Sequence, residues 1–458
     1  MVSVMSLRVP IAATAGELGE TTMARLAIVL LLFILAACTH KLPTPVAGCA
    51  FTTYPLRVDA ATARIASNTD YESVLRASMS APAPSSAPPG PGLVAATRPS
   101  VLILSGGSQN GAFGAGFFAG LPRVPDYKFV TGVSTGALQS TFLFLANTPV
   151  PADRTYPAYF PDVASHTNIG DLALAYAIGH ESDLVEAGGF GQVGGVIRGS
   201  VAGFGPLRGV LRGLLSPATL RAVGQAYRPD PREGRRLLIG VTDVSDGAGY
   251  AIDLTELANR LVTGAQGYAS VRDCYVDALI ASSSVPVAAP PVTLEARAPA
   301  GTTTRHLYID GGARFGVFWS QLGALLEDLD PEVTLIVNGS LASKPWVDAA
   351  GNPRTDWSAL TLALRSVDIL GNQVYRFSVE NVLRMGSGGG VVRMAFISNL
   401  NLPGAVEPAD FVFDGRRCRE WNDIDSREKP VEFHPRYMRC LLEYGRDRGR
   451  AEAWNRPK

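Results

Sequence analysis

The stretch Gly132-Val133-Ser134-Thr135-Gly136 lies between the apolar pair Phe129-Val130 and the apolar segment from Ala137 to Leu145. This order predicts a short strand that turns sharply into a helix. Glycines on both sides of Ser134 leave room for a strained backbone that pushes the serine side chain outward. The pattern Gly-x-Ser-x-Gly is typical of a nucleophile elbow, so Ser134 is the candidate nucleophile.

A glycine-rich turn lies upstream of the elbow. The apolar strand pattern Val101-Leu102-Ile103-Leu104 is followed by Ser105-Gly106-Gly107-Ser108-Gln109-Asn110 and then by a segment of small residues that predicts a helix. Backbone N–H groups at a helix N-terminus favour negative charge. An ester reaction needs such donors in place before the oxyanion develops. We therefore expect Gly106, Gly107 and Ser108 to form an oxyanion hole.

A second short strand, Leu307-Tyr308-Ile309, ends on the sequence Asp310-Gly311-Gly312. A serine hydroxyl is a weak nucleophile until a base takes its proton, and Asp310 is the candidate base. In open α/β sheets, ligands gather at the carboxyl ends of the strands. Ser134 and Asp310 are therefore expected at one edge of a sheet.

From Val101 onward, apolar strand patterns alternate with helical segments. This alternation favours an α/β fold with three α/β/α layers, in which a mostly parallel central sheet is covered on both faces. The remaining elements are expected as an edge strand over 250–252, strands over 236–244, 306–309, 333–337 and 391–397, and helices over 71–79, 266–280, 357–385 and 435–454.

The ordered set of glycine-rich loop, Gly-x-Ser-x-Gly and Asp-Gly-Gly resembles the patatin-like phospholipases over roughly residues 98 to 450. The segment Ala281-Ser282-Ser283-Ser284-Val285-Pro286 also resembles the family's segment before the strand with the aspartate. The resemblance implies a lipid acyl hydrolase of the phospholipase A or esterase type, with a Ser134–Asp310 dyad and an acyl-enzyme. It implies a lipid or small-ester substrate and no metal or organic cofactor.

The sequence departs from that family in its glycine-rich loop. Ser108 replaces the third glycine of the family's pattern, and Asn110 stands at its basic position. The Ser108 N–H can still donate if its backbone angle does not require glycine. Without the basic residue, a specific preference for phospholipids is in doubt.

The N-terminus resembles a bacterial export signal. Met23-Ala24-Arg25 leads into the apolar run Leu26 to Leu35, which has the length of a signal-peptide core rather than of a membrane span. The ending Leu35-Ala36-Ala37-Cys38 resembles a lipobox, which implies lipidation at Cys38 and a lipid-anchored protein at the outer membrane. The expected domains are a signal peptide over 1–37 with a possible true start at Met23, a lipidated N-terminus and Ala/Pro/Ser-rich linker over 38–97, and a hydrolase domain over 98–458.

Composition excludes some functions. Lys plus Arg and Asp plus Glu both number 41, so the chain lacks the basic surplus of a nucleic-acid-binding protein.

Besides Cys38 there are four cysteines, an even number that permits disulfides in an oxidising compartment. We favour a Cys418–Cys440 pair, while four reduced cysteines remain the alternative. No cysteine pair has zinc-ligand spacing with histidine.

Three questions stay open at this point. His434 follows Asp310 in the chain, so an α/β-hydrolase-type Ser–Asp–His triad is formally possible. A catalytically weak lipid-binding lipoprotein is a second alternative, because the oxyanion loop is altered. The glycine-rich stretch 188–197 is either a lid or an ordinary surface excursion, and the oligomeric state is not indicated.

Overall fold

We analysed a computed structural model of the 458-residue chain. It describes residues 45, 48–56, 71–81, 98–162, 166–187, 202–297, 302–317, 331–339, 346, 352–355, 357–385, 391–398, 406–428, 430 and 432–455. The predicted signal peptide, Cys38, the stretch 188–197 and residues 82–97 of the predicted linker lie outside these residues.

A nine-stranded mixed sheet forms the centre of the molecule, with strand order β11-β10-β2-β3-β6-β7-β1-β8-β9. The first five strands in this order are parallel to one another, whereas β7 is antiparallel to β6 and β9 is antiparallel to β8. The strands are β1 (Phe51–Leu56), β2 (Ser100–Leu104), β3 (Phe129–Val133), β6 (Arg236–Asp243), β7 (Gly249–Asp253), β8 (Val292–Arg297), β9 (Thr303–Asp310), β10 (Glu332–Val337) and β11 (Val391–Phe396).

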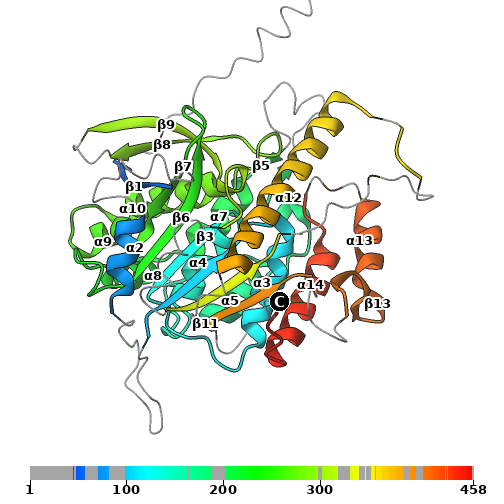
Figure 1. Ribbon diagram of the computed structural model, residues 1–458, viewed down its shortest axis with the longest axis horizontal. Coiled ribbons are helices and arrows are strands. Elements are labelled where there is room, and N and C mark those ends of the chain that lie inside the picture. The colour runs from blue at the N-terminus through cyan, green and yellow to red at the C-terminus, as the bar shows by residue number, and fades with distance from the viewer. Residues whose placement is uncertain are drawn as a thin grey trace, which may run out of the picture.

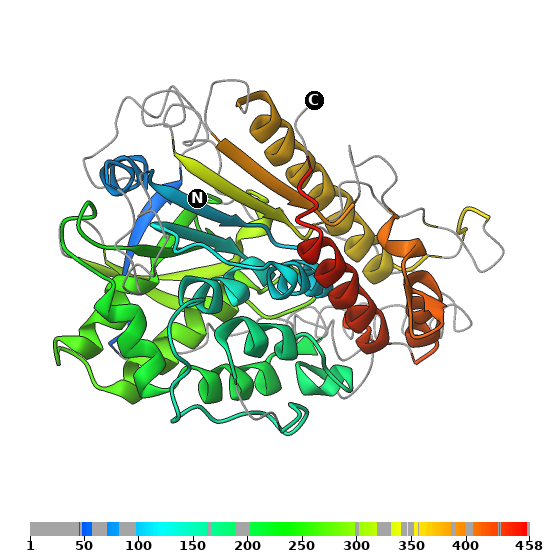
Figure 2. The same cartoon turned by 90° about the horizontal axis from the view of Figure 1, so that it is seen from below.

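Helices cover both faces of this sheet, as Figure 2 shows. Alternate side chains of β2 enter different cores: Leu102 and Leu104 pack on one face, and Val101 and Ile103 on the other. The first face is covered by α3 (Gly111–Gly120), α4 (Thr135–Phe144), α5 (Asn168–Ala175), α7 (Gly205–Leu214), α8 (Pro217–Gln225), α9 (Leu254–Val262), α10 (Tyr268–Ser282) and α14 (Pro435–Arg450). The second face is covered by α2 (Tyr71–Met79) and α12 (Ala359–Met385). The predicted three-layer α/β/α class is therefore confirmed.

Two predictions about the sheet were wrong. We expected the linker to run up to residue 97, but β1 lies inside the sheet between β7 and β8, and the expected helix α2 packs on the second face of the sheet instead of lying in a tether. We expected Tyr250-Ala251-Ile252 at an edge, but β1 covers that side of β7. The polar residues of Phe-Thr-Thr-Tyr-Pro-Leu concealed β1, because only its two end residues are fully buried.

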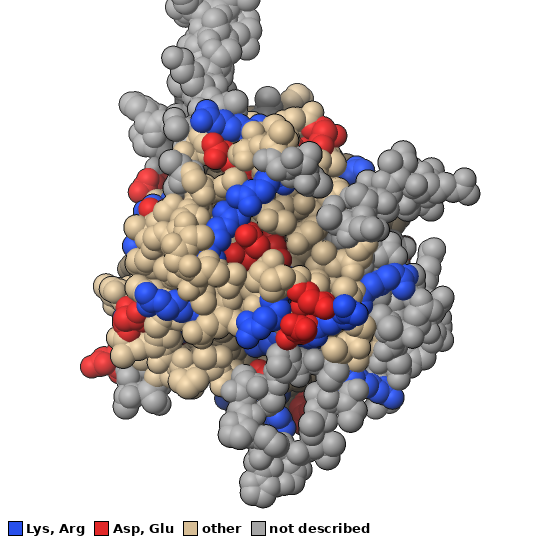
Figure 3. Space-filling model, turned by 90° about the vertical axis from the view of Figure 1, so that its left-hand side faces the viewer, with Lys and Arg blue, Asp and Glu red and all other residues tan. Residues whose placement is uncertain are grey.

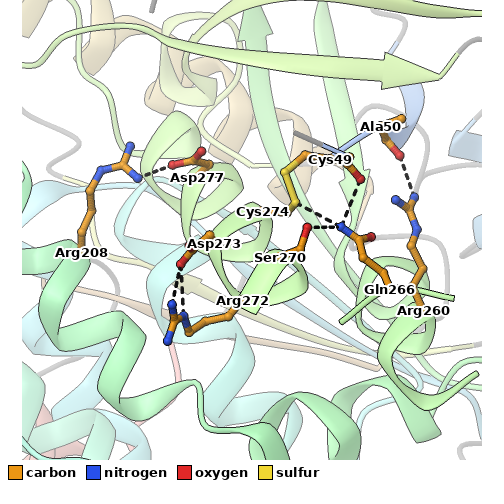
Figure 4. The surroundings of a disulfide bond; sticks show 11 residues. Cys49, Ala50, Arg208, Arg260, Gln266, Ser270, Arg272, Asp273, Cys274 and Asp277 are labelled. Carbon is orange, nitrogen blue, oxygen red and sulfur yellow. Dashed lines mark hydrogen bonds and ion pairs between the residues drawn. A yellow bond between two sulfur atoms is a disulfide. The ribbon is translucent and has the colours of Figure 1, made fainter. Parts of the chain in front are cut away.

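Two disulfides connect distant parts of the chain. Cys418–Cys440 joins α13 (Cys418–Ser426) to α14, which confirms the predicted pair. Cys49–Cys274 joins the residues before β1 to α10, across a sequence separation of 225 (Figure 4). Around this second disulfide, Arg260 donates to the Ala50 carbonyl at 2.7 Å and Gln266 donates to the Gly48 carbonyl at 3.1 Å. The N-terminal segment is thus attached to the domain by covalent and polar contacts.

Helices α3 and α14 pack with their backbones in unusually close approach. A Cβ atom on Gly116 would lie 2.0 Å from the Leu442 carbonyl oxygen, and one on Gly449 would lie 2.1 Å from that of Phe117. Only glycine fits at these positions. Gly116 of α3 and Gly449 of α14 therefore allow the two helices to pack closely.

Charges of both signs are interspersed on the face seen in Figure 3, in agreement with the zero net charge. Within the described residues, no helix has the length and apolarity needed to cross a bilayer. Helix α12, labelled in Figure 1, has large apolar side chains that are exposed: Leu370 is 66% and Phe377 58% exposed. These side chains point away from the sheet.

Candidate active site

The turn from β3 into α4 holds Ser134 in a strained conformation. Ser134 has φ 54° and ψ −125°, a region that residues with a side chain rarely adopt. A Cβ on Gly132 would lie 2.3 Å from the Gly136 carbonyl oxygen, and one on Gly136 would lie 2.5 Å from the Leu104 carbonyl oxygen. The two glycines of the pattern are therefore required by the tightness of the turn, as the sequence predicted.

Ser134 and Asp310 meet although their strands run in opposite directions. Strand β9 is antiparallel to β6, and its last residue, Asp310, pairs with Val241. The Asp310 carboxyl accepts the Gly312 N–H at 2.6 Å, and the Ser134 side chain lies close enough to lower the pKa of that carboxyl. Both residues are buried, with exposed fractions of 5% and 3%. The structure thus brings together the two side chains that the sequence singled out.

Burial raises the pKa of Asp310 from 3.8 to about 7, while the hydrogen bonds from Ser134 and Gly312 work in the opposite direction. A carboxyl group in water would be too weak a base to take a serine proton readily. Asp310 is poised near neutral pH, where a general base works best.

The end of α10 supports both residues at once. Ser282 accepts the Ser134 N–H through its hydroxyl oxygen at 3.0 Å and donates to the Gly240 carbonyl at 2.6 Å. The Ser284 carbonyl accepts the Asp310 N–H at 2.9 Å. The serine-rich segment quoted for its family resemblance therefore fixes the backbone of both candidate catalytic residues.

The loop Gly106-Gly107-Ser108 lies beside Ser134. A Cβ on Gly106 would lie 3.0 Å from the Ser134 Cβ. Among the hydrogen bonds of the described residues, none uses the N–H of Gly107 or Ser108 as donor. These two groups are available to bind a negatively charged oxygen, as an oxyanion hole requires.

Ser108 occupies a conformation better suited to glycine, with φ 50°. Its side chain donates a hydrogen bond to the Glu432 carboxylate, and the neighbouring Gln109 accepts the His434 N–H at 3.0 Å. Two contacts from the C-terminal segment thus hold the loop where the family pattern has a third glycine.

A buried polar network fixes the other end of this loop. Asn338, fully buried after β10, donates to the Ser105 carbonyl at 3.2 Å and accepts the Gly114 N–H at 3.0 Å. Gln139 of α4 donates to the Gly111 carbonyl at 2.7 Å. Neither residue belongs to a recognisable motif, so the sequence analysis missed both.

An apolar pocket opens at Ser134. Ser108, Ser283 and Glu432 also line it, and Glu432 is the charged group among its lining residues. Its apolar walls come from α4, α5 and α7, with Leu138, Phe142, Leu172, Ala175, Leu207, Val210, Leu211 and Leu214. Such a lining suits a hydrocarbon chain attached to the carbonyl that Ser134 would attack.

His434 does not complete a triad in this arrangement. It is the residue before α14, and its backbone N–H is bound by Gln109. The partners of the Asp310 carboxyl within the described residues are Ser134 and Gly312. No group of three or more histidine, cysteine, aspartate or glutamate side chains suited to a metal ion occurs in the described part of the chain.

A family model and a solved structure resemble parts of this chain. The family described as patatin-like phospholipase matches residues 102–321, which contain the glycine-rich loop, the elbow and Asp310. No curated protein matches the chain. The crystal structure of VipD from Legionella pneumophila aligns with 63% of this chain and 67% of that chain, at 12% identity and a TM-score of 0.21. The proposed site therefore lies in the segment that matches the patatin-like phospholipase family.

Proposed function

We propose that this protein hydrolyses carboxylic esters of lipids through Ser134 and Asp310, by way of an acyl-enzyme. The family match supports lipid acyl hydrolysis in general. The observation that carries the finer proposal is the proximity of the buried Ser134 and Asp310 side chains, with Ser134 lining an apolar pocket.

In the first half-reaction, the Ser134 oxygen bonds to the ester carbonyl carbon while its proton passes to the Asp310 carboxylate. The carbonyl oxygen becomes an oxyanion that receives the N–H groups of Gly107 and Ser108, with Gly106 beside them. The C–O bond to the alcohol then breaks, and the proton held by Asp310 passes to the departing oxygen. The acyl chain stays attached to Ser134 with its hydrocarbon in the pocket.

In the second half-reaction, water takes the place of the alcohol. Asp310 accepts a proton from the water as its oxygen attacks the acyl carbon, and the same oxyanion donors serve again. The bond to Ser134 breaks, Ser134 regains a proton from Asp310, and the fatty acid leaves. The serine and carboxyl groups account for every proton transfer.

The test compares hydrolysis of p-nitrophenyl butyrate, p-nitrophenyl decanoate and a phosphatidylcholine by the purified full chain. Ser134→Ala and Asp310→Asn should each lower kcat by a factor of about 10³ or more. Ser140→Ala is the matched control, because Ser140 is another buried serine of α4 and donates only to the Ala137 carbonyl of its own helix. Activity in Ser134→Ala equal to that of the wild type would refute the proposal.

Two further results separate the alternatives. His434→Ala should retain activity, whereas a Ser–Asp–His triad requires near-complete loss. Binding of lipid vesicles by a folded wild-type chain that turns over none of the three esters would favour the lipid-binding alternative.

We also propose that Cys38 is lipidated and anchors the protein at the bacterial outer membrane. The support is the lipobox-like sequence Leu35-Ala36-Ala37-Cys38. Mass spectrometry of the N-terminal peptide after expression in a Gram-negative host would detect the acyl modification, and Cys38→Ala should abolish it. An unmodified Cys38 in the membrane fraction would overturn this assignment.

A further inference from the structure

Tyr375 of α12 sits in a slot whose walls are glycine backbones. A Cβ on Gly316 or on Gly339 would lie 2.7 Å from the Tyr375 ring carbon Cδ1, and one on Gly106 would lie 2.0 Å from its hydroxyl oxygen. Any side chain at these three glycines would displace the ring. The slot is therefore shaped for an aromatic side chain at this point of α12.

The inner face of α12 is fixed at the same place. The Ser378 hydroxyl oxygen accepts the Gly316 N–H at 3.2 Å, and Val379 is buried in the core on the second face of the sheet. Leu370 and Phe377, in contrast, lie on the outer face of the helix and are exposed. The packing of α12 therefore directs Tyr375 toward the candidate site.

The Tyr375 hydroxyl lies near the candidate catalytic residues. A Cβ atom on Gly106 would lie 2.0 Å from this hydroxyl oxygen and 3.0 Å from the Ser134 Cβ. On the other side, a Cβ on Gly312 would lie 3.5 Å from the hydroxyl and 2.9 Å from the Asp310 Oδ1. The hydroxyl is thus close to the oxyanion loop and to the Ser134–Asp310 pair.

The hydroxyl is a donor rather than a base. Burial, with a smaller contribution from the negative charge of Asp310, raises the pKa of Tyr375 well above its ordinary value of 10. The phenol stays protonated at any pH at which the protein would work. A neutral O–H group can donate a hydrogen bond to an oxygen that gains negative charge, and the phenol keeps its proton while it does so.

We propose that Tyr375 is a further catalytic residue, whose hydroxyl donates a hydrogen bond to the ester carbonyl oxygen as Ser134 attacks it. This inference rests on the proposed function. The bond from the Ser134 oxygen to the carbonyl carbon forms, the carbonyl π electrons move to the oxygen, and the Ser134 proton passes to Asp310. Tyr375 keeps its proton throughout and stabilises the oxyanion together with the N–H groups of Gly107 and Ser108.

The test is Tyr375→Phe in the full chain, which removes the hydroxyl and leaves the ring to fill the slot. We expect kcat for p-nitrophenyl butyrate to fall about 10- to 100-fold, with KM changed less than about twofold, because the hydroxyl acts on the transition state. Tyr127→Phe is the matched control, since Tyr127 is a buried tyrosine and lines no part of the pocket. It should keep kcat within about twofold of the wild type.

A kcat within twofold of the wild type for Tyr375→Phe would overturn the inference, as would a rise in KM at unchanged kcat. A second measurement does not depend on this variant folding. In a crystal structure of the wild type inactivated by an alkyl phosphonate, the Tyr375 oxygen should lie within about 3.2 Å of the phosphoryl oxygen, and a separation beyond about 4 Å would refute the role. If the wild type neither hydrolyses esters nor forms the adduct, the proposed function fails. If it does both and Tyr375→Phe is unaffected, only this inference fails.

Discussion

The buried carboxyl of Asp310 should lower the free energy of unfolding of the protein at neutral and alkaline pH. Its pKa rises from 3.8 to about 7, so the folded protein binds this proton more tightly than the unfolded chain does. The stabilising effect of the proton is complete below about pH 4 and is lost as the pH rises through about 7. Each tenfold change in the acid constant is worth about 1.4 kcal/mol. Relative to acid conditions, the raised pKa of Asp310 therefore lowers the free energy of unfolding by about 4 kcal/mol at pH 8, where the group is ionised, and by about 2 kcal/mol at pH 5, where the folded protein must take up a proton.

Asp310→Asn tests this reasoning, because asparagine has nearly the same shape and never ionises. The gain in the free energy of unfolding over the wild type should be larger at pH 8 than at pH 5 by about 2 to 3 kcal/mol. Urea unfolding followed by tryptophan fluorescence at the two pH values gives this difference, in which effects of the substitution that do not depend on pH cancel. Asp162→Asn, at an exposed aspartate, controls for the loss of one charge.

The same carboxyl sets the pH dependence of the reaction. Because Asp310 must be ionised to accept the Ser134 proton, kcat/KM of the wild type should rise about tenfold per pH unit below about 7 and level off above it. The reasoning is refuted if the gain from Asp310→Asn is equal at the two pH values and kcat/KM is flat between pH 5 and pH 8.

Three other results are expected from the packing. Gly106→Ala would place a methyl group 2.0 Å from the Tyr375 hydroxyl oxygen, so it should lower the free energy of unfolding by about 1 to 3 kcal/mol. Adding Tyr375→Phe should recover at least half of the lost melting temperature, and additive effects of the two changes would contradict the slot geometry. Leu211→Phe should narrow the pocket and lower kcat/KM for p-nitrophenyl decanoate at least about fivefold more than for the butyrate, whereas equal effects would show that the acyl chain lies elsewhere. Replacing Cys49 and Cys274 together by serine should lower the free energy of unfolding in urea by about 2 to 4 kcal/mol, and no change would mean that the disulfide constrains little.

Much of the parallel half of the sheet could be predicted from sequence, because its strands are short apolar runs with glycine-rich turns at their carboxyl ends. The elbow at Ser134 is the clearest case, since a Cβ atom on either of its glycines would lie only 2.3 to 2.5 Å from a backbone carbonyl oxygen. The sequence also selected Asp310 as the partner of Ser134. It could not show that β9 reaches the site antiparallel to β6, because strand direction depends on connections that leave no local pattern.

The supporting residues were missed for a related reason. Tyr375, Asn338 and Gln139 act through contacts with residues far away in the chain, and each sits in an ordinary helix or strand end. Tyr375 is one aromatic residue in a 27-residue helix that also has exposed aromatic and aliphatic side chains. Nothing local distinguishes the one that faces Ser134. The strand β1 was missed because its mid-strand residues are polar or only half-buried.

The Cys49–Cys274 link has a practical consequence for anyone who shortens the gene for expression. The family match begins at residue 102, which invites a start codon near that point. A product that begins there would lack β1, leave β7 and β8 without the strand that joins them, and carry Cys274 as a lone thiol able to pair between molecules. A start between Cys38 and Cys49, in a host compartment that forms disulfides, keeps the sheet whole.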